Sequence, residues 1–354
     1  MTPIDLRSDT ITKPTPSMME HLVRAELGDD GRGDDPTVKR LEEMAAERMG
    51  KAAGLFVPSG TMGNLVSVLA HTGRSGEVLA EGSSHVFRTE LGGVAMVAGL
   101  LPRSVPGQRG AMDLPTLKQW IRPPALKPTA LGTALVSMET THNAAGGAVL
   151  PLRHMAEVYR IARDCGVPVH LDGARIFNAA VALGVDAREI AAHADSVTFC
   201  ISKGLSAPVG SLITGPADFI ERARGFRRIC GGNMRQSGLL AACGIVALEE
   251  MVARLKDDHA HARALADGLH RIDPSFVDPA AVETNIIMVS LPAGDGANEH
   301  WIKALNSRGV LASGARPGVL RLVTHRHIGA DDVKAAVAAF AAIYDEQRGR
   351  VNAA

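Results

Sequence analysis

Apolar positions recur along most of the chain with two periods, one typical of strands and one typical of helices. Short apolar runs bounded by polar residues predict buried strands at residues 55–57, 77–80, 134–138, 167–172 and 197–201. Apolar stripes at helical spacing predict helices at residues 36–49, 58–71 and 152–165. Strands that alternate with helices need crossover connections. The pattern therefore predicts an α/β fold with a mostly parallel sheet covered by helices on both faces.

The pattern changes after residue 238. A long helical stretch at 238–269, which we expect to break near Asp257, precedes two shorter strands and two helices. We place the strands at 285–291 and 319–323, and the helices at 299–307 and 331–346. We therefore expect a large α/β domain of residues 1–250, with an irregular N-terminal arm, and a small C-terminal α+β domain of residues 251–354.

The composition excludes several classes of protein. The 354 residues carry 38 Lys and Arg against 38 Asp and Glu, so no net charge attracts nucleic acid or a membrane surface. The longest apolar run, Val94–Leu101, is too short to cross a bilayer. Four cysteines without metal-ligand spacing, and an N-terminus without a signal peptide, predict a cytoplasmic protein with reduced thiols and no metal.

A lysine follows the strand at 197–201, in a loop broken by glycine and proline. Lys203 has two interpretations. Its stem could be buried while the ammonium group reaches water. Alternatively, partial desolvation could leave a nucleophilic amine that forms a Schiff base with a carbonyl group.

Other reactive side chains also follow predicted strands, where ligands bind in open α/β sheets. Ser59, Gly60 and Thr61 open a helix whose N-terminus could hold a phosphate, although they could equally form an ordinary N-cap. Asp172 could bond a cationic ring nitrogen, or could cap the next helix. His85 and His142 could face a ring or relay a proton, or could be structural.

Two arginines complete the set. Arg235 and Arg321 could grip a phosphate and a carboxylate, and each alone could equally be an ordinary ion-pair residue. Together, the phosphate-binding turn, the ring-facing histidine, Asp172 and Lys203 match, in chain order, what pyridoxal phosphate needs.

At this point the chain resembles the low-specificity L-threonine aldolases, which belong to the fold-type-I pyridoxal-phosphate enzymes related to the β-eliminating lyases. The resemblance rests on these stretches: Ile4-Asp-Leu-Arg-Ser-Asp-Thr10, Gly33-Asp-Asp-Pro-Thr-Val38, Pro58-Ser-Gly-Thr-Met-Gly-Asn64, Thr141-His-Asn143, His170-Leu-Asp-Gly-Ala-Arg175, Ser202-Lys-Gly-Leu205, Ala207-Pro-Val-Gly-Ser211, Met234-Arg-Gln236 and Leu320-Arg-Leu-Val-Thr-His325. It implies a fold-type-I transferase-like fold with a small C-terminal domain.

The resemblance also implies roles for single residues. Lys203 would form the Schiff base with pyridoxal 5'-phosphate, Asp172 would pair with the ring nitrogen, and His85 would stack on the ring. The phosphate would be held by Ser59, Gly60, Thr61 and Arg235 of a second subunit. The amino-acid carboxylate would be held by Ser8, Arg175 and Arg321, with His142 near the substrate hydroxyl.

The implied reaction is retro-aldol cleavage of an L-β-hydroxy-α-amino acid to glycine and an aldehyde, in a homodimer or homotetramer with shared active sites. The proton acceptor would be His85, His142 or a water that they orient. Arg32 and Phe87 stand where the family often has tyrosines. A substrate bulkier than threonine, such as phenylserine, is therefore also expected to fit.

Rival functions have weaker support. A β-eliminating lyase on the same scaffold is the main alternative, but lyases that release phenols generally need a tyrosine acid, and Tyr159 and Tyr344 both lie in predicted helices. An aminotransferase would need a keto acid as amino acceptor. A cofactor-binding regulator without turnover is disfavoured because no helix-turn-helix or basic stripe is found. A hydrolase built on Ser202 and Lys203 is disfavoured because adjacent strand residues point to opposite faces.

Overall fold

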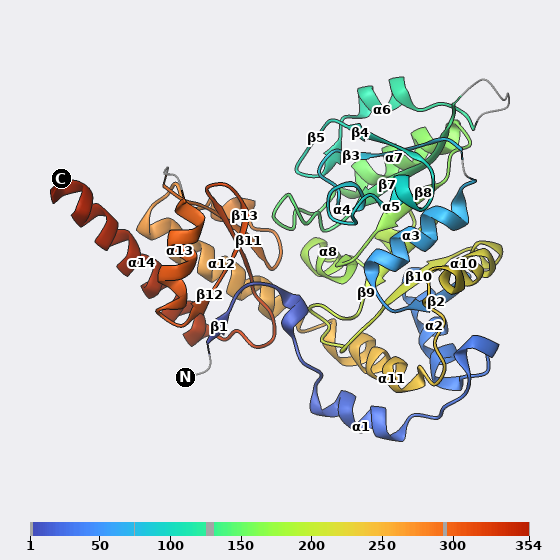
Figure 1. Cartoon of the computed structure of the whole chain (residues 1–354), viewed down its shortest axis with the longest axis horizontal. Coiled ribbons are helices and arrows are strands. Elements are labelled where there is room, and N and C mark those ends of the chain that lie inside the picture. Colours follow the sequence, from blue (N-terminus) through green and yellow to red (C-terminus); the bar gives the residue numbers. More distant parts are fainter. Residues whose placement is uncertain (1–2, 74, 125–130, 293–295, 354) are drawn as a thin grey trace.

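The structure is a computed structural model that describes residues 3–353 except 74, 125–130 and 293–295. A larger unit contains the N-terminal and central parts of the chain, and a smaller unit contains the C-terminal part (Figure 1). A separate hydrophobic cluster lies inside each unit. None of the described helices is both long enough and apolar enough to span a membrane.

The larger unit is built on a seven-stranded sheet with the order β2-β10-β9-β8-β7-β3-β4. Its strands are β2 (Ala53–Val57), β3 (Glu77–Glu81), β4 (Leu101–Val105), β7 (Thr133–Glu139), β8 (Val169–Asp172), β9 (Ser196–Cys200) and β10 (Ser211–Gly215). Only β10 is antiparallel to its neighbours. The other six strands therefore end at the same edge, as the predicted mostly parallel sheet requires.

Helices cover both faces of this sheet, as the alternation of elements predicted. The helices of the larger unit are α1 (Pro16–Arg24), α2 (Pro36–Met49), α3 (Gly60–His71), α4 (His85–Arg88), α5 (Gly93–Met96), α6 (Leu114–Trp120), α7 (Leu152–Asp164), α8 (Ile176–Leu183), α9 (Ala187–Ala191), α10 (Ala217–Ile229) and α11 (Gly238–Val246). Along β2, Leu55 and Val57 pack with residues of α3 and α10, whereas Phe56 packs in the cluster that includes α2 and α7. This alternation is the strand period of two.

Helix α2 has the predicted limits. Asp35 is its N-cap and accepts a hydrogen bond from the Val38 backbone nitrogen at 3.0 Å. Gly50 ends the helix with φ of +61°, a conformation that glycine adopts without strain. The helical stretch predicted from residue 238 is broken earlier than expected. It divides into α11, a π-helical turn (Ala247–Met251) and α12 (Leu255–Ile272), so the break precedes Asp257.

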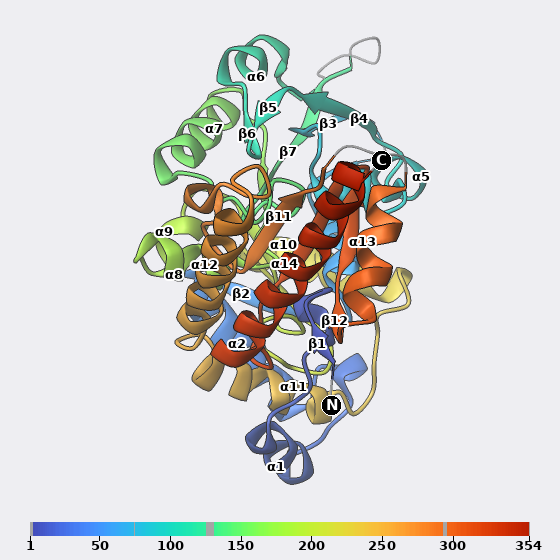
Figure 2. The ribbon, with the colours of Figure 1, turned by 90° about the vertical axis from the view of Figure 1, so that its left-hand side faces the viewer.

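The smaller unit is a three-stranded antiparallel sheet covered by helices (Figure 2). It contains α12, β11 (Ile286–Ser290), α13 (Ala297–Asn306), β13 (Ser313–Arg316), β14 (Val319–Val323) and α14 (Ala330–Ala353). Its aromatic centre is Phe276, which meets Trp301 and Phe340 edge-on. The α+β character expected for this part of the chain is confirmed, and the domain boundary near residue 250 stays a prediction.

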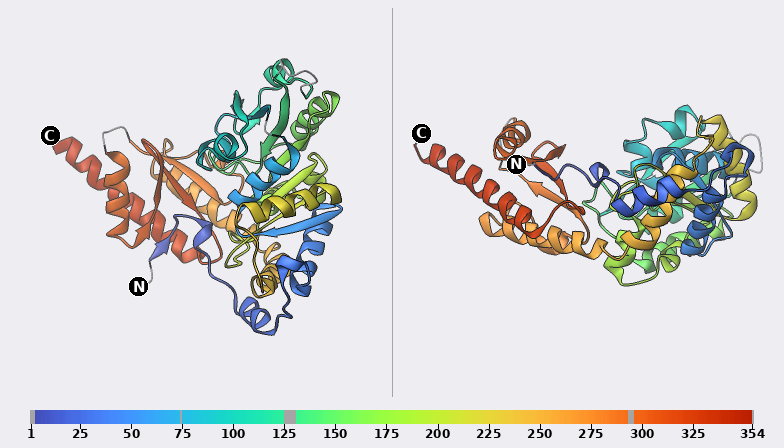
Figure 3. Two further views of the ribbon diagram at one scale, coloured as in Figure 1. Left: turned by 45° about the vertical axis from the view of Figure 1, so that its right-hand side comes forward. Right: turned by 90° about the horizontal axis from the view of Figure 1, so that it is seen from below.

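The N-terminal arm joins the two units. Strand β1 (Ile4–Asp5) pairs in parallel with β12 (Val310–Leu311), and Leu6 packs in the core of the smaller unit. The arm then passes beneath the larger unit, where α1 packs against α11 (Figure 3). Residues 7–13 lie between these two attachments and contact residues that follow strands of the large sheet, Thr12 with Lys203 and Asp9 with Arg175.

Candidate active site

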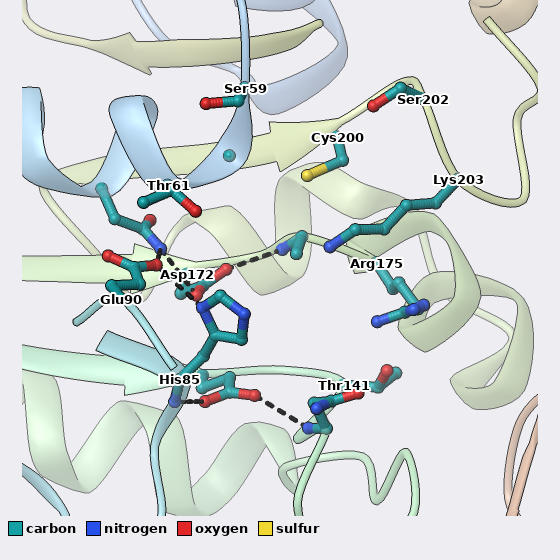
Figure 4. A pocket seen from close by; sticks show the side chains of 15 residues that line it. Ser59, Thr61, His85, Glu90, Thr141, Asp172, Arg175, Cys200, Ser202 and Lys203 are labelled. Atoms are coloured by element: carbon teal, nitrogen blue, oxygen red, sulfur yellow. Dashed lines mark hydrogen bonds and ion pairs between the residues drawn. The ribbon is translucent and has the colours of Figure 1, made fainter. Parts of the chain in front are cut away.

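A pocket of about 230 Å³ lies at the carboxyl edge of the large sheet (Figure 4). It is formed where β2, β7, β8 and β9 end and where the loop after β3 begins helix α4. Residues from all these strand ends line it: Ser59, Gly60, Thr61, Asn64, His85, Glu90, Glu139, Thr141, Asn143, Asp172, Ala174, Arg175, Cys200, Ser202 and Lys203. The structure therefore brings together Ser59, Gly60, Thr61, His85, Asp172, Arg175 and Lys203 of the predicted set.

Lys203 follows β9 and extends its side chain into the pocket (Figure 4). Its backbone carbonyl accepts hydrogen bonds from the Thr12 hydroxyl at 2.8 Å and the Ser206 nitrogen at 2.9 Å. Within the described part of the chain, no hydrogen bond or ion pair engages its amino group. The loop is thus held by its backbone, which leaves the amine available for chemistry.

The turn after β2 presents the N-terminus of α3 to the pocket. Ser59 is the N-cap and accepts a hydrogen bond from the Met62 nitrogen at 3.2 Å. The two interpretations of this turn are compatible, because a capped helix still presents its positive end to a ligand. Gly60 permits close packing, since a Cβ there would lie 2.8 Å from the Cys200 sulfur.

Asp172 ends β8 and is 4% exposed. Its Oδ2 accepts a hydrogen bond from the Asn64 side-chain nitrogen at 2.7 Å, and its Oδ1 accepts one from the Ala174 nitrogen at 3.0 Å. The carboxylate therefore has hydrogen-bond donors on both oxygens, which fix its orientation. Asp172 does not cap the next helix, because the N-cap of α8 is Arg175, so that interpretation was wrong. Its pairing with a ring nitrogen stays a prediction.

His85 forms part of a buried acidic cluster. Its Nδ1 lies 2.8 Å from the Glu90 carboxylate, and its backbone nitrogen donates to Glu139 at 2.6 Å. The hydrogen bond to Glu90 raises the pKa of His85, and burial raises the pKa of Glu90. Both directions favour a proton held between the two side chains. The imidazole faces Asp172 across the pocket (Figure 4).

His142 lies outside the set that lines the pocket. Its side chain is fully buried, with Nε2 3.1 Å from Glu81 and 3.7 Å from Glu139. A Cβ on Gly110 would lie 2.5 Å from the imidazole, so the turn at Gly110 covers the ring. Burial alone would lower the pKa of His142, but the contact with Glu81 outweighs it and raises the pKa. Its neighbours Thr141 and Asn143 line the pocket instead.

Arg175 is held by Asp9 of the N-terminal arm. Its Nε and Nη2 donate to the two carboxylate oxygens of Asp9 at 2.7 and 2.6 Å, and Asp9 is completely buried. Burial alone would raise the pKa of Asp9, but the Arg175 guanidinium holds that pKa well below its usual range. Asn285 of the smaller unit donates to the same carboxylate at 3.2 Å. The pair thus ties the arm to both units.

Arg321 reaches the same region from β14. Its Nη2 donates to the Asn143 side chain at 3.0 Å, and its Nε is buried without a hydrogen-bond partner in the described residues. Burial, and then repulsion from Arg175, lowers the pKa of Arg321 to about 10. Two guanidinium groups that repel each other beside a pocket favour an anion between them.

Arg235 and Ser8 lie outside the pocket lining of their own chain. Arg235 is exposed, with Nη1 3.5 Å from Asp29. Ser8 is the N-cap of a 3₁₀ turn (Asp9–Ile11), and its hydroxyl oxygen accepts hydrogen bonds from Thr10. Their predicted roles toward phosphate and carboxylate stay predictions.

Arg32 and Phe87, which stand where the family often has tyrosines, also lie outside the pocket lining. Arg32 is exposed and 3.7 Å from Asp29, and Phe87 packs into a hydrophobic cluster with residues of β3. Both tyrosines of the chain are engaged elsewhere. Tyr159 donates to Asp195 at 3.0 Å and Tyr344 donates to Asp273, so neither supplies an acid to this pocket.

Several residues that line the pocket, or that contact a residue lining it, were not among the candidates. Asp9 and Asn143 stood next to candidates in the same motifs, and Asn64 ended the Pro58–Asn64 stretch, so proximity in the sequence was an available signal. Glu90 and Glu139 had weaker signals. Glu139 is the last residue of β7, and side chains at the carboxyl ends of strands often contact ligands in open α/β sheets.

The chain is similar in sequence to known proteins. The family model described as Beta-eliminating lyase matches residues 5–292. The low-specificity L-threonine aldolase 1 of Arabidopsis thaliana is 43% identical over 343 residues, covering 96% of each chain. The low specificity L-threonine aldolase of Escherichia coli strain K12 is 41% identical over 332 residues, covering 93% of this chain and 96% of that protein.

One solved structure extends the likeness in fold. SPT, determined with pyridoxal phosphate bound, has a TM-score of 0.75 at 18% identity, covering 96% of this chain and 87% of SPT. Fold and sequence together therefore define the class as a carbon–carbon lyase on a fold-type-I scaffold. Within that class, the chain belongs to the low-specificity L-threonine aldolase family.

Proposed function

We propose that the protein uses pyridoxal 5'-phosphate to cleave L-threonine, L-allo-threonine or a bulkier L-β-hydroxy-α-amino acid to glycine and an aldehyde. The observation that carries this proposal is the convergence of Lys203, Asp172 and the N-terminus of α3 on one pocket. An amine, a carboxylate and a phosphate-binding helix end are the three groups that such a cofactor requires.

The residues fit the cofactor in their chemistry. The α3 N-terminus, with Ser59, Gly60 and Thr61, would hold the phosphate. Asp172, with donors on both oxygens, would pair with the ring nitrogen. Lys203 would bond its carbonyl carbon. When bound, the cofactor supplies an electron sink for the bond that breaks at the substrate Cα.

The protein's own residues would orient the substrate. Arg175 and Arg321 would bind its carboxylate, which relieves their mutual repulsion and gives Arg321 Nε a partner. Fixing the carboxylate at one side of the pocket would set which bond at Cα is aligned for cleavage. Ser8 would add a hydroxyl donor from the arm.

The β-hydroxyl proton must leave as the carbon–carbon bond breaks. We place its acceptor at Nε2 of His85, directly or through a water, because His85 lines the pocket and its Nδ1 is held by Glu90. His142 does not line the pocket. It would act indirectly, through its contacts with the Glu81 and Glu139 carboxylates.

We further propose a homodimer or homotetramer with shared sites. Arg235 is exposed and outside its own chain's pocket, and large apolar side chains are exposed at Val23, Leu91, Met96 and Ile229. Contiguous patches of such groups mark contacts between proteins. The four cysteines are free thiols, which supports the cytoplasm as the compartment.

The test is a substrate panel. Purified protein with pyridoxal phosphate is given L-threonine, L-allo-threonine and both phenylserine diastereomers, and glycine release is measured. We expect glycine from at least one L-substrate and none from the Lys203→Ala variant. A protein that binds no pyridoxal phosphate, or a Lys203→Ala variant with full activity, would overturn the proposal. Release of pyruvate and ammonia instead of glycine would indicate β-elimination.

A further inference from the structure

A chain of buried hydrogen bonds leads away from Asp172 beneath helix α3. Asn64 donates to both Asp172 Oδ2 and Glu90 Oε1 at 2.7 Å. The Asn64 oxygen is 3.2 Å from His170 Nε2, and His170 Nδ1 is 2.8 Å from the Ser196 hydroxyl. That hydroxyl is in turn 2.6 Å from His71 Nε2. Asp172, Glu90 and Asn64 line the pocket, whereas His170, Ser196 and His71 lie outside its lining.

Regular structure explains why these residues meet. His170 and Asp172 are two residues apart on β8, so both side chains point to the same face of the sheet. Asn64 and His71 are seven residues apart on α3, about two helical turns, so they share the helix face that packs on that sheet. Ser196 is the partner of His170 in the parallel pairing of β8 with β9.

In this hydrogen-bond network, the donor and the acceptor of each bond follow from the two carboxylates at its inner end. A carboxylate accepts only, so Asn64 must present both amide hydrogens to Asp172 and Glu90 and its oxygen to His170. His170 therefore carries a proton on Nε2. With Nδ1 then an acceptor in the neutral ring, Ser196 donates to it and accepts from His71 Nε2.

Burial favours the neutral form of both histidines, His170 and His71. His170, Ser196 and Asn64 are each no more than 2% exposed. Burial lowers the pKa of His170 to about 4 and the pKa of His71 to about 3. His71 also stacks on Phe219 with ring centroids 4.2 Å apart, which fixes the outer end of the chain.

We propose that His170 is a positioning residue, held as the neutral Nε2–H tautomer, which acts through Asn64 to orient the Asp172 carboxylate for the cofactor's ring nitrogen. The inference rests on the proposed function, because Asp172 has this task only if pyridoxal phosphate binds. All donors point toward Asp172, so each hydrogen bond adds to the stability of its negative charge.

The first test measures the tautomer directly. The full chain, with histidine labelled by nitrogen-15, is studied by NMR at neutral pH with and without pyridoxal phosphate, and the His170→Gln variant assigns the His170 signals. We expect a neutral ring protonated at Nε2 in both samples. A proton on Nδ1, or on both nitrogens, would overturn the proposal. This readout is independent of whether the protein cleaves threonine.

The second test measures the effect on cofactor affinity. His170→Leu removes the donor to Asn64, and we expect the dissociation constant of pyridoxal phosphate to rise about tenfold or more. His170→Gln keeps an amide donor near the position of Nε2 and should restore affinity to within about threefold. His154→Leu, on helix α7 outside this network, controls for the loss of a partly buried imidazole.

The outcomes separate the possible failures. His170→Leu with wild-type cofactor affinity would overturn the positioning role. An equal loss in His170→Leu and His170→Gln would show a purely structural role and would also overturn it. If His170→Leu does not fold, the wild-type tautomer decides. A protein that binds no pyridoxal phosphate at all refutes the proposed function and leaves the tautomer result standing.

Discussion

Asp9 is the residue on which the geometry of the two arginines depends most directly. Its carboxylate engages Nε and Nη2 of Arg175, which leaves Nη1 as the guanidinium nitrogen not committed to Asp9. Asn285 donates to the same carboxylate. A buried ion pair of this kind is stable only while both partners are present, because a single buried charge is costly.

We therefore expect Asp9→Asn to free Arg175 and weaken substrate binding. The kcat/KM for the best substrate should fall roughly 10- to 100-fold, mainly through KM, and stability should fall by about 3–5 kcal/mol. Steady-state kinetics and urea unfolding measure both. Asp5→Asn, which removes a carboxylate paired with exposed Arg7 on the same arm, is the control and should have little effect. An unchanged KM in Asp9→Asn would contradict this view of the clamp.

His170 should also leave a signature in the pH dependence of folding. Its pKa is about 4 in the folded chain and about 6.5 when unfolded, so the unfolded state binds the extra proton in between. Its contribution is therefore fully present above pH 6.5 and is lost as pH falls toward 4. Between pH 7.5 and pH 5 the loss amounts to about 2 kcal/mol.

The His170→Gln variant isolates this contribution from other titrating groups. Urea unfolding of wild type and variant at pH 7.5 and pH 5 should show that wild type loses about 2 kcal/mol more than the variant on acidification. His300→Gln, at an exposed position, controls for removing a histidine. Equal losses in wild type and His170→Gln would show that His170 is not buried and neutral.

Single residues were predictable where they stood at strand ends. Lys203 and Asp172 follow apolar runs, so the sequence alone placed them near the same edge of the sheet. Glu90 was not predictable in this way. Glu90 contacts His85 only because the chain turns tightly through helix α4, and no local sequence pattern predicts that turn. The burial of His142 likewise depends on Gly110, a residue distant in the sequence.

Among the elements, helix α3 has the most demanding position, because its N-terminus must face the pocket while its body lies close on the sheet. Gly63 allows that approach. A Cβ there would lie 2.6 Å from Cγ2 of Thr198 on β9, which no real packing tolerates. The distance of α3 from the sheet thus depends on one missing methyl group.

We expect Gly63→Ala to push α3 away from β9. Overpacking of this kind costs about 1–3 kcal/mol, and the displaced helix end should bind pyridoxal phosphate more weakly. Thr198→Ser removes the clashing methyl and keeps the hydroxyl that lies 3.4 Å from Ser67. The double variant should recover stability and cofactor affinity. A double variant no better than Gly63→Ala would show that the clash is not the cause.

Some elements could not be predicted from their own residues. Strand β10 runs antiparallel between β2 and β9, and its five residues follow a loop with no helix in between. Only the pairing with both neighbours identifies it. Helix α1 was included in the irregular arm, although Thr15 as N-cap and Pro16 in the first turn are favourable start signals. Its apolar face is explained by packing on α11, a contact over long sequence separation.

At the scale of the whole molecule, Arg235 lies outside the pocket that Lys203 lines in its own chain. Its guanidinium lies 3.5 Å from Asp29, which caps the 3₁₀ turn at Asp30–Arg32, and Gly31 in that turn leaves room beside it. If this arginine completes the phosphate site of a neighbouring subunit, two defective chains should repair each other.

Mixing subunits tests this directly. Lys203→Ala and Arg235→Ala proteins, each of low activity, are unfolded, combined in equal amounts and refolded. A hybrid dimer has one site with both residues intact, so the mixture should reach about a quarter of wild-type activity. Each variant refolded alone is the control. Activity no higher than the mean of the two controls would show that Lys203 and Arg235 do not meet across subunits.

The pairing of β1 with β12 joins positions 4 and 310, and Leu6 continues it through hydrogen bonds with Leu311 and Val323. During translation, residues 4–6 are synthesised about 300 residues before their partners at 310–323. Asp9, three residues beyond Leu6, is therefore not anchored until the late segment emerges. Nascent chains that stall before residue 310 should consequently lack an ordered clamp for amino acids, and a truncated product that has already bound vitamin B6 should remain inert toward them.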